Sequence, residues 1–174
     1  MLKAISIGLG VLVLAAAGLV AYASLRPDNF RVSRSASIAA PPEAVFALIA
    51  DLRKFNTWNP YARKDPAMRG VHAGPDSGPG ASYAWESDKV GVGKMTITDV
   101  AAPGRVSMRL DFERPFKATN GATFSIRPRD GGSDVTWTME GAMPLVSKVI
   151  DVVIGLDRML GRDFEEGLAN LKAI

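Results

Sequence analysis

The feature that most constrains the fold is a series of short segments in which apolar and polar residues alternate, as in β-strands with one solvated face. The segments predicted as strands cover residues 30–39, 68–73, 81–87, 93–100, 106–113, 118–127 and 135–141. Turn-forming residues such as Pro103-Gly104 and Asp130-Gly131-Gly132 separate the later segments at intervals of about 10–13 residues. This pattern predicts an antiparallel sheet of about seven strands, mostly connected as a meander.

The alternation agrees from strand to strand and gives the predicted sheet one apolar face. The members of that face are Tyr83, Trp85, Met95, Ile97, Val106, Met108, Leu110, Phe112, Ala122, Phe124, Ile126, Val135, Trp137 and Met139. The opposite face carries Thr, Ser and charged residues, including Asp111 and Glu113. We therefore expect a sheet that is solvated on one side and covered on the other.

Helical spacing predicts the cover. Pro42 suits the first turn of a helix that follows the first strand, and a second short helix is expected over residues 53–58, ended by Pro60. Apolar residues of the C-terminal segment 145–174 form one helical stripe: Val149, Val153, Leu156, Leu160, Phe164, Leu168 and Leu171. Three glycines interrupt this stripe, at positions 155, 161 and 167. They indicate either close approach to the sheet or a break near Gly155, or else room for a cavity.

An uncharged apolar run extends from Ala4 to Leu25, 22 residues in all. At ~1.5 Å per residue such a helix is long enough for a hydrocarbon core of ~30 Å, so we predict a transmembrane anchor over residues 1–29 and a soluble domain over 30–174. A cleaved signal peptide is the alternative, since Lys3 precedes the run and Ala21-Tyr22-Ala23 is a small-x-small sequence. The run exceeds the ~7–15 residues of a usual signal core, which favours an uncleaved anchor.

The charge distribution does not favour nucleic-acid binding. The net charge is +3, with 21 Lys and Arg against 18 Asp and Glu, and the basic residues are scattered. Arg26, Arg31 and Arg34 cluster after the apolar run and are interpreted as juxtamembrane charge. The positive-inside rule places the domain in the cytoplasm, whereas the signal-like start indicates export; we favour the outer face.

Few residues qualify for catalysis or metal binding. The chain has no Cys and a single His, His72, and no cluster with metal-ligand spacing, so neither a cofactor nor a metal is expected. His72 lies beside a glycine-rich loop and is interpreted as a surface or structural residue. In the last helix, Arg158 with Asp157 and Arg162 with Glu166 are expected to form surface pairs. No catalytic residue is predicted.

Several motifs occur together in a characteristic order. They are Ile38-Ala-Ala-Pro-Pro-Glu-Ala-Val-Phe46, Trp58-Asn-Pro60, Asp65-Pro-Ala-Met68, Gly78-Pro-Gly-Ala-Ser-Tyr-Ala-Trp85, Gly91-Val-Gly-Lys-Met-Thr-Ile97 and Val135-Thr-Trp-Thr-Met-Glu-Gly141. In this order the chain resembles the START-like or SRPBCC superfamily, and within it a group of membrane-anchored bacterial proteins of polyketide cyclase type. The resemblance implies an α+β helix-grip fold, in which the sheet wraps a long C-terminal helix. With the predicted anchor, it also implies a single-pass protein of the bacterial cytoplasmic membrane.

The resemblance also implies an apolar cavity between the sheet and the long helix. The residues expected to line it are Tyr83, Trp85, Met108, Phe124, Trp137, Met139, Leu156 and Leu160, and the alternative is that they are simply core. The first hypothesis is a monomeric, membrane-tethered domain that binds a hydrophobic small molecule or lipid. The second is an enzyme of cyclase or aromatase type, which would need His72, Glu86 or Arg109 inside the cavity. The third is a partner-binding protein that uses the apolar stretch 143–156.

Overall fold

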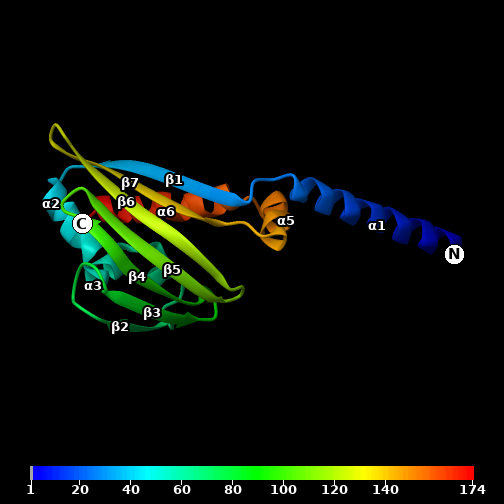
Figure 1. Ribbon diagram of the computed structural model, residues 1–174, viewed down its shortest axis with the longest axis horizontal. Coiled ribbons are helices and arrows are strands. Elements are labelled where there is room, and N and C mark those ends of the chain that lie inside the picture. Colours follow the sequence, from blue (N-terminus) through cyan, green and yellow to red (C-terminus); the bar gives the residue numbers. More distant parts are fainter. Residues whose placement is uncertain (1) are drawn as a thin grey trace.

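The computed structural model describes residues 2–174, with side chains from residue 8 onward. In that range the chain forms one seven-stranded antiparallel sheet with helices on one face (Figure 1). The strands are β1 Asn29–Ile38, β2 Arg69–Ala73, β3 Ser82–Ser87, β4 Gly91–Ala101, β5 Arg105–Arg114, β6 Ala118–Arg129 and β7 Gly132–Ala142. The helices are α1 Leu2–Ser24, α2 Pro42–Ala50, α3 Leu52–Trp58, α4 Pro60–Lys64, α5 Leu145–Ile154 and α6 Leu156–Lys172. The predicted α+β class and helix-grip arrangement are confirmed.

The strand order is β1-β7-β6-β5-β4-β3-β2, so the first strand pairs with the last. Strands β2 to β7 form the predicted meander, and the three short helices α2 to α4 carry the chain from β1 to the opposite edge. The register of β1 on β7 places Ser33 opposite Thr138 and Ser35 opposite Thr136, and the hydroxyl groups of each pair are hydrogen-bonded at 3.0 and 2.8 Å. These hydroxyl pairs lie on the polar face.

The predicted apolar face is buried beneath the helices. Ile97, Val106, Phe124 and Val135 are fully buried, as expected for strand residues that point toward the helix layer. Leu110 and Phe112 are on the same face but only half-buried. Their partial burial marks the end of the sheet where the cover is incomplete.

Side-chain capping explains where two of the short helices, α3 and α4, begin. The Asp51 carboxylate accepts from the backbone N–H of Arg53 and Lys54 and begins α3. The Asn59 side chain accepts from the Tyr61 N–H and begins α4, with Pro60 in its first turn. Pro60 therefore starts a helix, where the sequence predicted only an end, because the first turn does not need the missing N–H.

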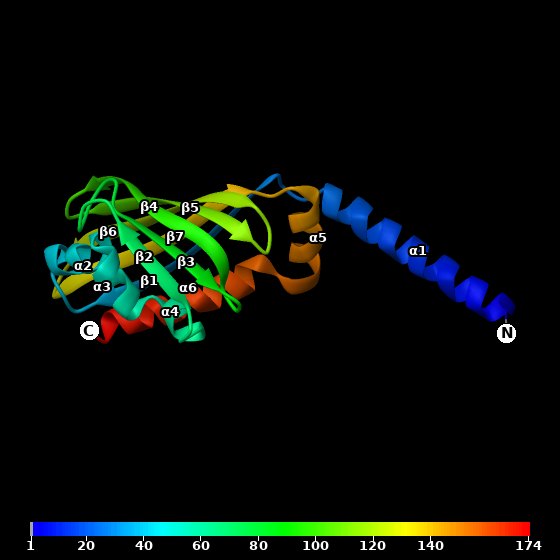
Figure 2. The same ribbon diagram turned by 90° about the horizontal axis from the view of Figure 1, so that it is seen from below.

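The C-terminal segment is two helices. Gly155 has φ +78°, a left-handed conformation that ends α5 and allows α6 to start in a new direction. Figure 2 shows α6 lying along the sheet, while α5 stands across one end of it, next to α1. A Cβ on Gly167 would lie 2.8 Å from Cζ3 of Trp137 and 3.0 Å from Cδ of Pro60, so this glycine permits close packing. Both structural explanations for the glycines therefore apply.

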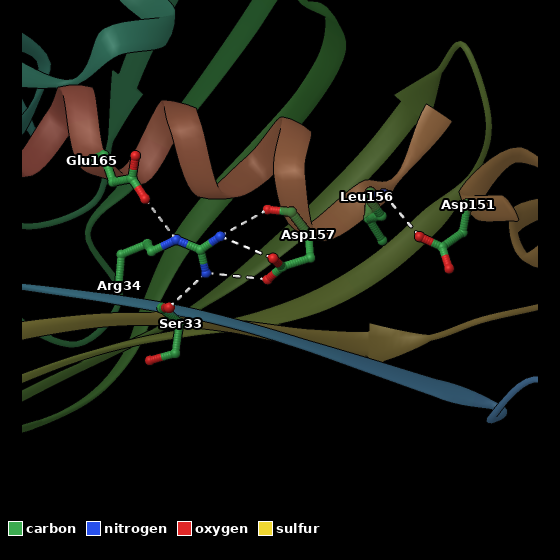
Figure 3. A network of polar contacts seen from close by, with 6 residues as sticks. All are labelled: Ser33, Arg34, Asp151, Leu156, Asp157 and Glu165. Carbon is green, nitrogen blue, oxygen red and sulfur yellow. Dashed lines mark hydrogen bonds and ion pairs between the residues drawn. The ribbon is translucent and has the colours of Figure 1, made fainter. Parts of the chain in front are cut away.

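Gly161 provides space for a polar contact between β1 and α6, seen from close by in Figure 3. The Arg34 guanidinium, which comes from β1, occupies the space that a Gly161 side chain would need. Arg34 donates to the carboxylates of Asp157 (2.9 and 3.1 Å) and Glu165 (2.9 Å) and to the carbonyls of Ser33 and Asp157. The guanidinium lowers the pKa of the Asp157 carboxyl. Asp157 thus pairs with a strand residue, and not with its helix neighbour Arg158 as predicted.

No helix in the described part of the chain is both long and apolar enough to span a membrane. This finding contradicts the predicted transmembrane anchor over residues 1–29. The predicted localisation as a single-pass protein of the bacterial cytoplasmic membrane is corrected with it.

Candidate ligand cavity

A cavity of about 420 Å³ lies between the apolar face of the sheet and the helices α3 to α6. Its apolar wall includes Phe30, Met68, Met95, Leu110, Phe112, Ile150 and Leu160. Three exposed apolar side chains also line it: Phe116 between β5 and β6, Ile154 at the end of α5, and Met159 on α6. These three indicate that the cavity opens between the β5–β6 turn and the bend at Gly155.

The eight residues predicted to line a cavity fall into two groups. Tyr83, Trp85, Met139, Leu156 and Leu160 line it. Met108, Phe124 and Trp137 lie instead in the solid core, each at most 4% exposed. A role in ligand binding stays a prediction for all eight.

Aromatic packing explains why Phe124 and Trp137 are remote from the cavity. The Trp137 ring stacks on Phe164 of α6 at a centroid distance of 4.2 Å and lies 4.9 Å from Phe124. Phe55 and Trp58 of α3 pack against the rings of Phe124 and Trp137, with centroid distances of 5.9 to 6.3 Å. We call these five side chains (Phe55, Trp58, Phe124, Trp137 and Phe164) the aromatic cluster. It fills one end of the space between the sheet and α6.

Several lining residues were not predicted from the sequence. They come from α3, α4, α5 and the β5–β6 turn: Asn56, Asn59, Tyr61, Ala62, Pro115, Phe116, Ser147, Ile150 and Asp151. Asn56 and Asn59 stand next to the core residues Phe55 and Trp58. The position of these two polar residues beside core residues was the sequence signal that could have indicated them as part of the cavity wall.

Two buried polar atoms of the lining residues lack a hydrogen-bond partner among the described residues. They are Nε1 of Trp85 and Oδ1 of Asn56. Trp85 is only 7% exposed, and its ring lies over Gly93 of β4, where a Cβ would be 2.6 Å from Cζ2. A buried polar group without a partner costs about 1–3 kcal/mol. Both atoms are enclosed by protein atoms, so neither is open to the cavity.

The titratable groups of the cavity wall are neutral or paired. Burial raises the pKa of the Tyr83 hydroxyl, which lies 3.7 Å from Sδ of Met68. Burial and the neighbouring Asp163 raise the pKa of Tyr61. Both tyrosines are therefore uncharged at neutral pH.

The charged lining residues Arg114 and Asp151 have protein partners. Arg114 pairs with Glu86 at 3.3 Å. Asp151 pairs with Arg26 at 2.9 Å and also accepts from the Leu156 N–H at 2.8 Å, which joins α5 to α6 across the bend. The described wall thus offers an apolar surface, several neutral polar groups and no charge that is free of a partner.

The three residues considered for catalysis lie outside the cavity. His72 lines a small hollow with Arg53 and Asp76, and burial together with Arg53 lowers its pKa. Glu86 forms exposed pairs with Arg69 and Arg114, and Arg109 pairs with Asp111 on the polar face. Among the described residues, no group of three or more His, Cys, Asp and Glu could hold a metal ion.

Helix α5 closes the end of the cavity and is fixed by the segment that precedes β1. Lys148 is buried and donates to Asp28 at 2.6 Å, which lowers the pKa of the Asp28 carboxyl. The Met143 N–H donates to the Asp28 carbonyl at 2.6 Å. On the other side of α5, Leu145, Val146 and Val153 are exposed, so the stretch 143–156 is partly covered and partly free.

The arginines interpreted as a juxtamembrane cluster pair with different acidic residues of the domain. Arg26 pairs with Asp151, Arg31 with Glu140, and Arg34 with Asp157 and Glu165. Each pair connects the N-terminal part of the chain to a C-terminal element.

Solved structures show the same fold. Protein CV1439 from Chromobacterium violaceum is 16% identical with a TM-score of 0.59, over 85% of this chain and 96% of that one. Protein Ms6760 from Mycobacterium smegmatis is 18% identical with a TM-score of 0.58, over 82% and 88% of the two chains. DynU16, a putative protein in the dynemicin biosynthetic locus, is 14% identical with a TM-score of 0.56, over 85% of this chain and 47% of that one.

The comparison with curated protein sequences gave no significant match. A family model does match, over residues 29–174, and its description is polyketide cyclase/dehydrase and lipid transport. These residues include every strand of the sheet and every element that lines the cavity. The chain is therefore a member of the polyketide cyclase/dehydrase and lipid transport family, within the SRPBCC superfamily.

Proposed function

We propose that the domain binds a hydrophobic small molecule or lipid in the cavity between the sheet and the helices α5 and α6. The observation that carries the proposal is the cavity itself. Its volume of about 420 Å³ is within the range of small-molecule sites, ~300–1,000 Å³. Protein interiors normally pack as densely as organic crystals and contain few voids larger than a water molecule. A cavity of this size is therefore unusual for a core and typical of a binding site.

The chemistry of the wall supports binding over catalysis. The apolar side chains supply affinity through the burial of ligand surface, and the few polar groups can orient the ligand. A cyclase or aromatase would need an acid or base next to the substrate. The three side chains considered for that role, His72, Glu86 and Arg109, lie outside the cavity, and the one carboxylate of its described wall, Asp151, is paired with Arg26.

Native mass spectrometry of the full chain purified from its host tests the proposal. The wild-type protein is expected to carry a small molecule, or to take up an added apolar molecule such as fluorene. Leu160→Trp places a larger side chain in the cavity wall and is expected to lower occupancy about tenfold or more, since overfilled interiors resist further insertion.

Val153→Trp is the matched control. It adds the same side chain to α5 at a position that is 68% exposed and is not part of the cavity wall. This variant is expected to bind as the wild type does. A wild-type protein that neither carries a small molecule nor takes up fluorene would overturn the proposal, and so would equal occupancy in Leu160→Trp.

A further inference from the structure

We infer that helix α5 is a hinged lid of the cavity, and that residues 26–28, which precede β1, form the latch that holds this lid closed. The inference rests on the proposed function and adds a means of regulating access to the same site. The exposed side chain of Ile154 on α5 lies at the cavity opening, together with Phe116 and Met159. The residues of α5 that line the cavity are Ser147, Ile150, Asp151 and Ile154. Movement of α5 away from α6 therefore widens the opening.

A glycine hinge lies at the C-terminal end of α5. Gly155 has φ +78°, and a Cβ added there would meet nothing closer than the Cβ of Arg158 at 3.9 Å. Gly155 thus combines the conformational freedom of glycine with open space around it. Hinges are a few residues at the ends of elements that absorb changes in φ and ψ. The bend between α5 and α6 has this character.

Helix α5 is packed much less firmly than the helix that follows it. Its one buried residue is Lys148, whereas α6 buries Phe164, Leu168 and Leu171. Among the described residues, α5 packs mainly against α1 and less against α6. A segment with few buried apolar contacts opens at a lower free energy than the core does. The position of α5 therefore depends on its polar contacts.

Two ion pairs form the latch. Lys148 Nζ donates to the Asp28 carboxylate at 2.6 Å, and Arg26 pairs with Asp151 at 2.9 Å. The Lys148 side chain is only 7% exposed, and Asp28 is its one ion-pair partner among the described residues. A buried charge that loses its counter-ion is strongly unfavourable. The closed position of α5 is therefore stabilised by a residue that lies outside α5 and outside the sheet.

Asp151 connects the latch to the hinge. Its carboxylate also accepts from the Leu156 N–H at 2.8 Å, across the bend between α5 and α6 (Figure 3). Arg26 thus holds the carboxylate that fixes the first turn of α6 relative to α5. Arg26 and Asp28 both precede residues 29–174, the range that the family model matches. Access to the cavity is therefore controlled by a segment outside that range, next to α1.

Stopped-flow fluorescence tests the latch with N-phenyl-1-naphthylamine, an uncharged apolar dye that fluoresces more strongly in apolar surroundings. In the full chain, the double variant Arg26→Gln/Asp28→Asn removes both ion pairs. Its association and dissociation rate constants are both expected to rise about three- to tenfold, the effect of two lost ion pairs. The dissociation constant is expected to stay within about twofold of the wild-type value, because a lid that opens more often speeds entry and exit alike.

Amide hydrogen exchange tests the same lid in the ligand-free chain. The double variant should exchange the backbone amides of α5 faster than the wild type does, because local opening exposes them. The amides of residues 164–171, in the packed part of α6, should exchange as in the wild type.

Arg31→Gln is the matched control, because it removes an exposed ion pair with Glu140 that joins β1 to β7 and does not involve α5. Its rate constants and its α5 exchange are expected to equal those of the wild type. Unchanged rate constants or unchanged α5 exchange in the double variant would overturn the inference and leave the proposed function intact. A higher dissociation constant without faster association would also overturn it. A wild-type chain that binds neither the dye nor fluorene would overturn the proposed function, and the inference with it.

Discussion

The two ends of the space between sheet and helices are built from the same strand face but differ in how they are filled. At one end the aromatic cluster packs solidly, with Trp137 stacked on Phe164 at 4.2 Å. At the other end Trp85, on the same face of the sheet, lines a cavity of about 420 Å³. Both tryptophans are more than nine-tenths buried. Burial of a strand residue therefore does not tell whether it belongs to a core or to a binding site.

The helices cause the difference. At the packed end, α3 inserts Phe55 and Trp58, and Gly167 allows α6 to come close to Trp137. At the hollow end, the left-handed residue Gly155 turns the chain away from the α6 axis. Helix α5 stands across that end of the sheet (Figure 2) and lines the cavity with Ile150 and Ile154.

The largest expected effect is at the packed end. Phe164→Ala should lower the free energy of unfolding by about 3–5 kcal/mol, because it removes a fully buried ring and leaves a void. Phe112→Ala, at the hollow end, is the matched comparison and should cost clearly less, since that ring is half-buried beside an existing cavity. Urea unfolding of both variants measures the difference. Equal losses would break the distinction between the two ends.

A smaller loss of stability is expected when a methyl group is added where α6 packs closely against its neighbours. Gly167→Ala places a Cβ against Trp137 and Pro60 and should cost about 1–3 kcal/mol, despite the better helix propensity of Ala. Gly161→Ala meets the end of the flexible Arg34 side chain and should cost less. Thermal and urea unfolding would compare the two variants, and a larger loss for Gly161→Ala would contradict this account of α6.

A pH-dependent contact lies next to the hollow end, where the lining residues Met68 and Val90 donate their backbone N–H groups to Asp65 and Ser87. The Asp65 carboxylate accepts from Ser87 Oγ at 2.6 Å and from the Ala67 N–H at 3.1 Å, and these hydrogen bonds lower the pKa of Asp65. The folded state then binds the proton less readily than the unfolded state. The stabilisation is fully present above the unfolded value near 3.8 and is lost as the pH falls through the lower folded pKa.

Ser87→Ala removes the largest cause of this shift, so the pKa of Asp65 should rise toward its ordinary value. NMR titration of the Asp65 carboxyl measures it. Ser37→Ala, which removes a hydrogen bond to Asp134 on β7, serves as the control and should leave Asp65 unchanged. An Asp65 pKa that stays low in Ser87→Ala would show that other contacts set it.

The smallest effect is expected for an exposed ion pair. Arg31 and Glu140 are 3.3 Å apart, with side chains 70% and 60% exposed. Arg31→Gln should change the free energy of unfolding by no more than about 0.5 kcal/mol, because solvent and salt screen such pairs. A loss above about 1 kcal/mol in urea unfolding would mean that this pair contributes more than surface pairs usually do.

The sheet could be predicted from the sequence because alternation reports directly which strand residues face the helices. It identified Trp85 and Trp137 equally well as inward-facing. The alternation could not tell which of the two tryptophans belongs to the core and which to the cavity wall. That difference depends on Phe164, Gly167 and the bend at Gly155, which are distant in the sequence.

Two other expectations failed for physical reasons. Pro60 was expected to end a helix and begins one, because Asn59 caps it. Asp157 was expected to pair along its own helix and pairs with Arg34 of β1, in a space that Gly161 leaves open. Helical spacing predicts which side chains are neighbours within one helix, but it does not predict contacts between different elements.

The methionine methyl groups give the most direct test that the hollow end binds a hydrophobic ligand. Met68, Met95, Met139, Met143 and Met159 line the cavity, whereas Met108 is buried in the solid core. In ¹³C-methyl-labelled full chain, addition of fluorene should shift the methyl signals of the five lining methionines and leave that of Met108 unchanged. No shift at the lining methionines, or a shift of Met108 as large as theirs, would contradict the account.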